Sequence, residues 1–336
     1  MQKRNNVIDA AKYVAALMVI AIHTGLFSDV NDVLYVFVVH IVCRAAVPFF
    51  AICTGYYMGG KLTFHDKLEY STKNRDVFVY RWKKVVALYL IWTCMYLVFS
   101  IPFWIRSGWY SPMAFVDYAI AALINGSHYH LWYLLYLIYS LPIAYLLLRW
   151  CPEKHQVLLI SVLWIIAAFT YTYKNFLPEP VFELLQPVNQ FSTLPVLLPL
   201  LLLGVRISRG KRKRCRFYLI GFIVSFLLLI AEAFMLWHYG IETVSFIICT
   251  LPTAYFLFNL ILEMRIPSQY KFAGILGAVS TFVYCVHPMF IETVGNRINN
   301  SILKFVTVSI ASTATGWIYY SLKTRLIEKK DHSCFN

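Results

Sequence analysis

The sequence predicts an all-α, polytopic membrane protein of about ten transmembrane helices with its N-terminus and C-terminus in the cytoplasm. Of its 336 residues, 60% are hydrophobic and only 14% are charged, whereas roughly half apolar is ordinary for a soluble domain. The apolar residues form nearly charge-free blocks, such as Leu131–Leu148 and Phe217–Leu236. A bilayer span needs about 20 such residues. Each block is expected to be a helix, because backbone groups in lipid must be satisfied within the segment.

The expected spans alternate with loops of different charge. We place them at 7–27, 34–58, 85–104, 130–149, 156–172, 191–207, 217–238, 243–262, 273–293 and 302–322. Of the 30 Lys and Arg residues, 25 fall in alternate loops and chain ends on one side, including Lys12 just inside the first span, and the positive-inside rule assigns this side to the cytoplasm. The exceptions are Arg106, Lys174, Arg297 and Lys304 on the other side, and Arg44 inside a span. The net charge of +14 therefore indicates anionic lipid as partner, at Arg209–Arg214 above all, and no nucleic acid.

The whole chain, 1–336, is expected to be a single transmembrane domain, because no repeat or low-complexity tract interrupts it. Its basic cytoplasmic loops are 59–84 and 206–216. Within 105–129, the apolar run Ala114–Ile124 is too short to cross a bilayer. We interpret 105–129 as an amphipathic or re-entrant element at the outer face. The first span has no small-x-small cleavage site, so it is kept as a span and not as a signal peptide.

The eight cysteines predict neither disulfides nor a metal site. Five lie in expected spans, three on the cytoplasmic side and none in an expected outer loop: Cys43, Cys53, Cys94, Cys249 and Cys285, then Cys151, Cys215 and Cys334. No CxxC-type metal spacing occurs. We therefore expect no metal.

The first span carries Asp9, Lys12 and His23. An ionisable side chain at the membrane centre costs roughly 2.5–3.5 kcal/mol on insertion scales, so each is a functional hypothesis. Lys12 and His23 are eleven residues apart, which places them within about 20° of one helix face. Asp9 shares that face, so the stripe is expected to face the protein interior or a wet cavity. Two alternatives stay open: an interfacial Asp9–Lys12 pair that reaches the headgroups, and a structural His23.

The second span carries His40 and Arg44. Arg keeps its charge in a protein, so Arg44 needs an anionic partner. This partner is either a structural one, such as Asp9 or a helix C-terminus, or a bound phosphate or carboxylate. His40 is readily explained as an ordinary buried histidine.

Two further segments place histidines in the outer half of the expected membrane. His128, His130 and Trp132 begin the fourth span, although an aromatic belt alone would explain Trp132. His287 precedes Pro288, which frees a carbonyl one turn back and can kink the helix. Glu292 follows closely. A purely structural bend remains the alternative at this position.

His23, His130 and His287 suit proton transfer near neutral pH. No G-x-S-x-G elbow, HExxH zinc pair or P-loop occurs in the sequence. The residue types therefore favour either acid–base chemistry on a small acceptor or proton-coupled transport, and do not choose between them.

Several segments together resemble the integral membrane family called acyltransferase 3. The resemblance covers nearly the whole chain, and five motifs occur in the family's order. They are Ile8–His23, Arg44–Tyr56, Tyr80–Lys84 with Leu90–Trp92, His128–Leu134 and Val283–Pro288. Within the family, the chain looks most like the branch of enterobacterial-common-antigen O-acetyltransferase and the membrane domain of vancomycin-type serine racemases.

The resemblance implies an O-acyltransferase of the bacterial cell membrane. It would move acetyl from cytoplasmic acetyl-CoA to a hydroxyl of an extracytoplasmic or lipid-linked polysaccharide, with polysaccharide-assembly proteins as further partners. His23 would be the general base, His287 an orienter or second proton carrier, and Asp9 part of the catalytic set. The donor and acceptor would be bound by Lys12, Arg44, Thr54, Arg81, Lys84, His130, Trp132 and Glu292.

Three positions depart from the family pattern. Lys12 stands where Arg is usual, Thr54 where Ser is frequent and Leu88 where Pro is expected, so donor binding is expected to differ in detail. No hydrolase-like or racemase domain is expected to follow within the 336 residues. The main rival hypothesis is a transporter or binding domain for a small polar solute such as L-serine. A weaker one is a structural partner of a polysaccharide export complex.

Overall fold

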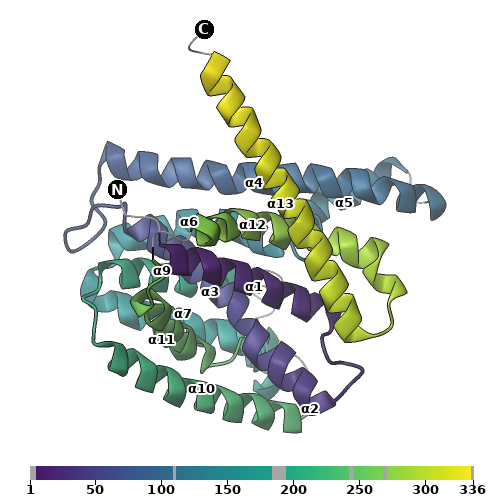
Figure 1. Cartoon of the computed structure of the whole chain (residues 1–336). Helices are drawn as coiled ribbons and strands as arrows, with labels where there is room; N and C mark the ends of the chain where they lie inside the picture. Colours follow the sequence, from purple (N-terminus) through teal and green to yellow (C-terminus); the bar gives the residue numbers. More distant parts are fainter. Residues whose placement is uncertain (1–4, 109–110, 184–193, 242–245, 268–270, 334–336) are drawn as a thin grey trace. The chain divides into compact units, whose positions relative to one another are not determined.

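The computed structural model of the chain consists of helices joined by loops (Figure 1). It describes residues 5–108, 111–183, 194–241, 246–267 and 271–333. Within these ranges, eight helical segments are long and apolar enough to cross a membrane. They are Asn6–Thr24, Asp32–Gly59, Thr72–Arg106, Trp132–Trp150, Glu153–Tyr171, Cys215–His238, Phe272–Arg297 and Ser301–Arg325. The prediction of an all-α polytopic membrane protein is confirmed, while the side on which its ends lie stays a prediction.

The two remaining predicted spans coincide with shorter helices, α9 (Leu194–Arg209) and α11 (Thr250–Glu263). Predicted positions 191–193 and 243–245 lie outside the described residues. The prediction of helix over 246–249 is wrong, since α11 begins only at Thr250. There the Glu232 carboxylate accepts the backbone N–H groups of Ile248 and Cys249 at 2.9 and 2.8 Å. These bonds hold the chain in a non-helical entry to α11.

The chain forms two compact units. The first comprises Val47–Asn259, and the second comprises the described parts of Lys3–Ala46 and Leu260–Asn336. The boundaries fall within α11 and at the start of α3 (Ala46–Gly59).

The second unit is built on α1 (Asn6–Thr24), α12 (Lys271–Thr293) and α13 (Ser301–Ser333). The side chain of Asn5 caps α1 by accepting the Val7 N–H at 2.9 Å, which satisfies one of the open donors of the first turn. Gly25 ends the helix with φ 63°, a left-handed conformation that glycine adopts without steric cost. Both ends of α1 are therefore set by its own sequence.

Contacts along α1 fix the directions of its two neighbours. Asp9 lies against Gly277 and His23 against His287, so α12 runs parallel to α1. The Tyr13 hydroxyl hydrogen-bonds Thr313 at 2.8 Å and the Phe27 N–H donates to Ser301 at 3.0 Å, so α13 runs antiparallel. These directions match those expected for the first, ninth and tenth spans. The short turn η4 (Gly295–Arg297) connects α12 to α13.

The predicted second span, 34–58, is not one regular α-helix. It consists of α2 (Asp32–Tyr35), the π-helix η1 (Val36–Val42), the 3₁₀ turn η2 (Cys43–Ala45) and α3. Pro48 has no N–H to donate to the Arg44 carbonyl one turn back, so the regular backbone hydrogen-bond pattern of an α-helix is interrupted in this turn. Such π and 3₁₀ stretches are frequent at functional sites.

In the first unit, α9 is buried along most of its length, with Val196, Leu200, Leu201 and Val205 fully covered. It crosses α3 at very short range. A Cβ on Gly55 would lie 2.1 Å from the Leu201 carbonyl oxygen, and one on Gly204 would lie 2.1 Å from that of Ile52. Small residues are what allow helix backbones to approach so closely in a membrane.

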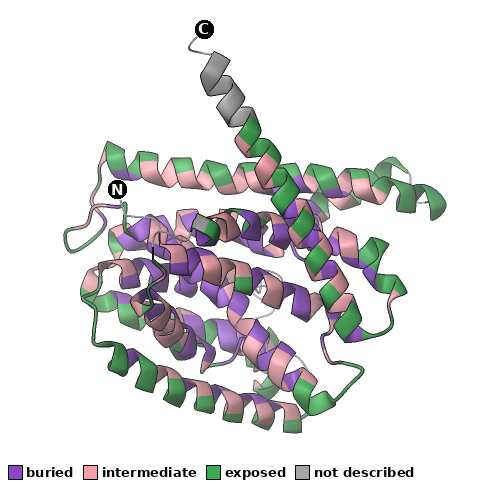
Figure 2. Cartoon of the chain, viewed as in Figure 1, coloured by how far each residue is buried: buried purple, intermediate pink, exposed green. Residues whose placement is uncertain are grey.

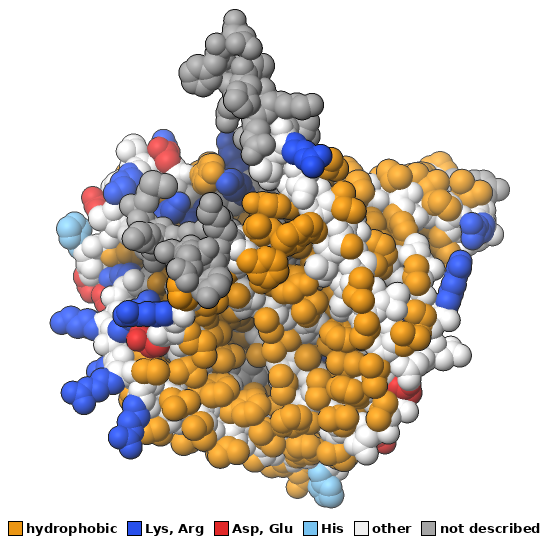
Figure 3. All heavy atoms as spheres, viewed as in Figure 1, with side chains coloured by type: hydrophobic (Ala, Val, Ile, Leu, Met, Phe, Trp, Pro, Cys, Tyr) orange, Lys and Arg blue, Asp and Glu red, His pale blue; other side chains and the backbone are white. Residues whose placement is uncertain are grey.

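The remaining helices of this unit include α10 (Cys215–His238), which is largely exposed (Figure 2). Its Val224, Leu227 and Leu228 side chains are 52%, 60% and 55% exposed. Hydrophobic side chains also cover much of the molecular face drawn in Figure 3. Water would penalise so much exposed apolar surface, whereas lipid would not.

Helix α4 (Thr72–Arg106) begins inside the predicted loop 59–84, and α5 (Pro112–Ile124) lies inside the predicted outer element 105–129. The last carbonyls of α5 accept hydrogen bonds from tyrosine hydroxyls on α4 and α6 (Trp132–Trp150): Tyr89 to Ala122, Tyr136 to Ile124 at 3.0 Å and Tyr139 to Leu123 at 2.6 Å. These bonds satisfy acceptors that a helix end leaves open. They fix this 13-residue helix, which is too short to cross a bilayer, against α4 and α6. The unit also contains helix α7 (Glu153–Tyr171) and the turn η3 (Lys174–Phe176).

Candidate functional site

The polar stripe of α1 faces protein and not lipid. Asp9 is 5% exposed, and the Lys12 ammonium lies 3.3 Å from its Oδ1 atom. The Lys12 side chain is 24% exposed. A buried carboxylate needs such a partner, because removing a charge from water is costly. The structure therefore brings Asp9 and Lys12 together as an ion pair covered by the second unit.

Helix α12 has a glycine where Asp9 packs. A Cβ on Gly277 would lie 2.4 Å from Asp9 Oδ1 and 2.6 Å from its Cβ, well inside van der Waals contact. Only glycine leaves room for the carboxylate between α1 and α12. Sequence reasoning did not single out Gly277, because the sequence does not show which side chain packs against a glycine in an apolar helix.

The two histidines predicted to act in catalysis meet farther along the same pair of helices. The rings of His23 and His287 stack with 5.4 Å between centroids and 26° between planes. His287 is fully buried, and its Nδ1 lies 2.7 Å from the Tyr284 carbonyl oxygen. Because His23 is eleven residues after Lys12, about 16 Å of α1 separates the histidine pair from the ion pair.

Glu292 and Arg44 complete the predicted residues of this unit. Glu292 is exposed in the last turn of α12, and Arg44 is half-buried in the 3₁₀ turn η2. His40, in the π-helix, is buried with its ring edge-on to Tyr35 at 4.9 Å. This packing is that of an ordinary buried histidine, which is how the sequence analysis explained His40.

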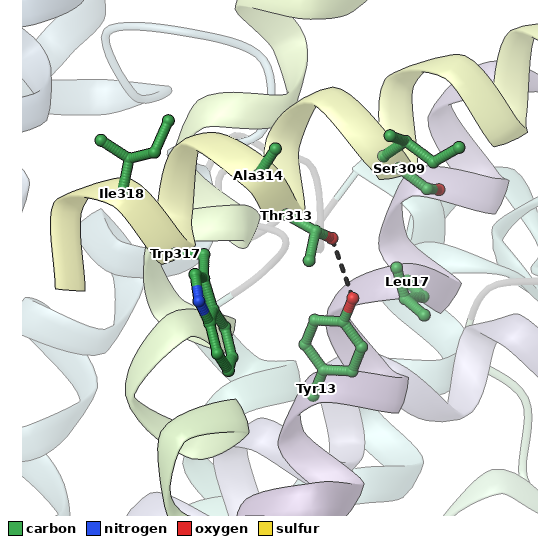
Figure 4. Close-up of a pocket in the computed structure, with 8 residues that line it drawn as sticks. Tyr13, Leu17, Ser309, Thr313, Ala314, Trp317 and Ile318 are labelled. Carbon is green, nitrogen blue, oxygen red and sulfur yellow. Dashed lines mark hydrogen bonds between the residues drawn. The ribbon is translucent and has the colours of Figure 1, made fainter. Parts of the chain in front are cut away.

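A groove of about 550 Å³ runs between α1 and α13 on the turn of α1 that follows Lys12 (Figure 4). Its lining is almost entirely apolar, with the Tyr13–Thr313 hydrogen bond as its main polar feature. The lining residues are Tyr13, Leu17, Ser309, Ile310, Thr313, Ala314, Trp317 and Ile318. None of these residues was predicted to belong to the site.

The other predicted binding residues lie in the first unit, where three of them make local contacts. Arg81 donates from Nη2 to the Tyr57 carbonyl in the last turn of α3 at 2.9 Å. The Lys84 ammonium lies 4.4 Å from the centroid of the Tyr80 ring. Thr54 donates to the Phe50 carbonyl at 3.0 Å. Arg81 therefore stabilises the C-terminus of α3, and exposed Lys84 keeps its ammonium at the surface.

His130 has a partner that sequence reasoning did not assign to the site. Its Nδ1 lies 3.2 Å from Nδ1 of His128, so the two imidazoles share a hydrogen bond. The buried ring of Tyr96 on α4 packs against both, at 4.2 Å from His128 and 5.1 Å from His130. The adjacent Trp132 is half-buried and edge-on to Tyr133. Sequence reasoning did not predict that the two Nδ1 atoms face each other.

Part of the basic run 206–216 is engaged with protein. Arg206 and Arg209 both bind the Glu153 carboxylate, Arg209 at 2.6 Å. The Arg209 guanidinium also lies 4.0 Å from the centroid of the Phe64 ring. Lys211, Lys213, Arg214 and Arg216 are exposed, and anionic lipid stays the predicted partner of the run.

Among the described residues, no group of three or more His, Cys, Asp or Glu side chains is arranged to hold a metal ion. The second unit brings together two imidazoles, a carboxylate and an ammonium group. Imidazoles move protons near neutral pH, and a cation attracts the anionic parts of a substrate.

Comparison with known proteins gives similarities over nearly the whole chain. Two Enterococcus faecalis proteins named amino-acid racemase are 25% and 26% identical over 96% and 97% of this chain. The serine/alanine racemase of Enterococcus gallinarum is 28% identical over 91% of it. The matches cover 46%, 47% and 45% of these proteins, so the chain spans less than half of their length. No solved structure matches the chain.

The model of the acyltransferase 3 family, described as an acyltransferase domain, matches residues 5–321. That range contains every predicted site residue in both units. Proteins of this family are multi-pass membrane proteins, which agrees with the eight apolar helices and with a place in the plasma membrane. The chain therefore belongs to the acyltransferase 3 family.

Proposed function

We propose that the protein is an O-acyltransferase that moves acetyl from cytoplasmic acetyl-CoA to a hydroxyl of an extracytoplasmic or lipid-linked polysaccharide. The observation that carries the proposal is the arrangement of α1 and α12. One end of this helix pair holds the Lys12–Asp9 ion pair, and the other holds the stacked His23–His287 rings. The first supplies a cation for an anionic donor, and the second supplies bases for a hydroxyl acceptor.

The spacing fits a long, flexible donor. About 16 Å of helix lies between Lys12 and His23, so an extended pantetheine arm can connect a phosphate near Lys12 with a thioester near His23. The family resemblance assigns Arg44, Arg81 and Lys84 to the phosphates of the donor. Thr54, His130, Trp132 and Glu292 are assigned to donor and acceptor contacts on the family resemblance, and polysaccharide-assembly proteins are proposed as partners that deliver the acceptor.

In the proposed reaction, the acceptor hydroxyl gives its proton to the His23 imidazole. Its oxygen then attacks the thioester carbonyl carbon. The C–S bond breaks as the ester C–O bond forms, and the departing thiolate takes up the proton that His23 accepted, so charge and atoms balance. General-base assistance of this kind contributes about 10²–10⁴-fold to a rate.

The test uses inside-out membrane vesicles supplied with radiolabelled acetyl-CoA, followed by isolation of glycan and lipid-linked saccharide. We expect label in the glycan with the wild type and a loss of at least about 10²-fold with His23→Ala. His238→Gln, which changes an exposed histidine at the end of α10, is the matched control. Equal membrane amounts of the variants establish folding, and full transfer by His23→Ala would refute the assignment.

One observation favours a second function. The similar proteins are named amino-acid and serine/alanine racemases, and the chain covers less than half of each. A domain of this kind in such a protein would bind or carry an amino acid such as L-serine across the membrane. Uptake of radiolabelled L-serine by the same vesicles, without label transfer from acetyl-CoA, would favour this function over the enzyme.

A further inference from the structure

His287 is the one histidine among nine that is followed by proline. In an α-helix, the N–H of residue i donates to the carbonyl of residue i−4. At position 288 that carbonyl belongs to Tyr284, but Pro288 has no N–H. The sequence therefore removes the backbone donor that Tyr284 would have received.

The His287 ring occupies the position of that donor. Its Nδ1 lies 2.7 Å from the Tyr284 carbonyl oxygen. A carbonyl only accepts, so the proton of this hydrogen bond sits on Nδ1 of His287. A neutral imidazole carries one N–H, so its other nitrogen, Nε2, holds the lone pair.

The same device occurs elsewhere in the chain. Pro142, inside α6, leaves the Ile138 carbonyl without its helical donor, and the Trp82 indole N–H donates to that carbonyl at 3.0 Å. In both places a side-chain N–H replaces the amide that proline lacks. At Pro142 the donor is an indole, which has no acid–base function near neutral pH, whereas at Pro288 it is an imidazole.

We propose that Pro288 is a positioning residue that fixes the tautomer of His287. By freeing the Tyr284 carbonyl, it holds His287 as the Nδ1–H form and makes Nε2 the proton acceptor of the ring stacked on His23. His287 is then a second proton carrier in the site and not merely a donor that orients His23. The catalytic consequence rests on the proposed acyl transfer, while the tautomer itself does not.

The tautomer is tested by nitrogen NMR on ring-labelled histidine in protein reconstituted in lipid, with the His287 signals assigned by their loss in His287→Gln. We expect a protonated Nδ1 and an unprotonated Nε2 for neutral His287 in the wild type. The opposite tautomer in the wild type would overturn the proposal without any further variant.

Pro288→Ala restores an amide N–H that competes for the Tyr284 carbonyl. We expect the Nδ1–H population of His287 to fall in this variant. Pro142→Ala is the matched control, because it makes the same backbone change in α6 and should leave His287 unaltered. An unchanged His287 tautomer in Pro288→Ala would contradict the assigned role of the proline.

Acetyl transfer separates this inference from the proposed function. We expect Pro288→Ala to lower kcat by about 10-fold or more while the KM for acetyl-CoA stays within about 2-fold, because a proton-transfer group is affected and donor binding is not. His287→Asn, which keeps an N–H donor near Tyr284 but has no basic nitrogen, should fold and lose transfer. A wild type that shows the tautomer but transfers no acetyl would refute the proposed function alone. A changed tautomer with unchanged kcat would refute the positioning role alone.

Discussion

Each ionisable side chain of α1 meets a polar partner inside the second unit. Lys12 lies beside Asp9, and His23 stacks on His287. Partners of this kind are needed because an isolated charge in an apolar environment is strongly unfavourable. The pairing explains how α1 tolerates its polar residues.

Replacement of Lys12 by Met removes the ammonium and keeps an unbranched chain of similar length. We expect the KM for acetyl-CoA to rise roughly 10- to 100-fold, because hydrogen bonds to charged groups contribute about 1.5–3 kcal/mol, with a smaller change in kcat. Initial rates of acetyl transfer at varied acetyl-CoA give both constants.

Two further variants are controls for that result. Lys12→Arg restores the residue usual in the family resemblance, and we expect it to keep or lower the KM because a guanidinium binds phosphate with two hydrogen bonds. Lys304→Met removes a lysine whose ammonium lies 3.4 Å from Asn296, in the expected outer region of the same unit. An equal rise in KM for Lys304→Met would show that general charge, and not Lys12, attracts the donor.

At the residue scale, sequence reasoning singled out α1 and His287 for the candidate site but not the packing around them. The helical spacing of Asp9, Lys12 and His23 was sufficient to predict one inward face. The packing of Asp9 against Gly277 depends on a contact between two helices far apart in the sequence. The pairing of His128 with His130 depends on the conformation of the turn before α6. Helical periodicity carries no information about such contacts.

At the scale of elements, α1 and α12 form the contact on which the site depends. The contact is tightest at Gly277, where the Asp9 carboxylate fills the space of a side chain. The same parallel helices then bring His23 to His287. A change in the packing at one end is therefore expected to reach the histidine pair at the other.

Gly277→Ala tests this contact. The added Cβ would lie 2.4 Å from Asp9 Oδ1, so α1 and α12 must separate. Overpacking costs about 1–3 kcal/mol, which exceeds the roughly 1 kcal/mol that alanine gains over glycine in a helix. We expect a lower unfolding midpoint in detergent and reduced acetyl transfer. Gly210→Ala is the control, since its Cβ would meet the Arg206 carbonyl oxygen at an ordinary 3.4 Å. Equal stability of the two variants would contradict the packing argument.

Asp29 connects the loop after α1 to the first turn of α13. Its carboxylate accepts the Ser301 hydroxyl, the Ser301 N–H at 3.2 Å and the Asn300 amide at 3.4 Å. The hydrogen bond from the Ser301 side chain is the main reason that the pKa of Asp29 lies below its ordinary value. A carboxylate at this position is also stabilised by the positive, N-terminal end of the α13 helix dipole.

This lowered pKa gives a pH dependence of defined sign. The ionised carboxylate stabilises the fold at pH values above the ordinary Asp pKa, and its contribution is lost as the pH falls through the lowered native pKa. We expect Asp29→Asn to lower the unfolding midpoint at neutral pH and to match the wild type only at pH values below the lowered native pKa. Thermal unfolding across that range measures the difference. A difference that stays constant down to the lowest pH would exclude Asp29 as its source.

The existence of the helices could be predicted better than their internal form. Ten apolar blocks coincide with ten helical segments of the described residues, because a span must be long and apolar. The break into π and 3₁₀ turns before Pro48 was not predicted, and neither was the late start of α11 at Thr250. Both depend on single backbone hydrogen bonds. Hydropathy is averaged over a window of residues, so it carries no information about them.

At the scale of the whole molecule, the charge pattern sets the expected orientation in the membrane. The positive-inside rule places 25 of the 30 basic residues in the cytoplasm. With that orientation, the Lys12 end of α1 lies toward cytoplasmic acetyl-CoA and the His23 end toward an outer acceptor. The reverse orientation would place the histidine pair on the donor side, and the proposed direction of acyl transfer would fail.

Native cysteines offer a direct test of this orientation. Cys151, Cys215 and Cys334 are all assigned to the cytoplasmic side, so the test uses the Cys334→Ser chain as its reference, in which exposed Cys215 is the most accessible of the two that remain. Partial burial raises the pKa of the Cys151 thiol, so it holds less thiolate and reacts more slowly. We expect a membrane-impermeant maleimide to leave this reference chain unlabelled in intact cells and to label it in inside-out vesicles. Cys215→Ser should remove most of the rapid labelling in the inside-out vesicles.

A cysteine introduced at Ser28, in the expected outer loop and exposed, should reverse the pattern and react in intact cells. Rapid labelling of native Cys215 from outside the cell would invert the membrane topology and, with it, the roles assigned to the two ends of α1.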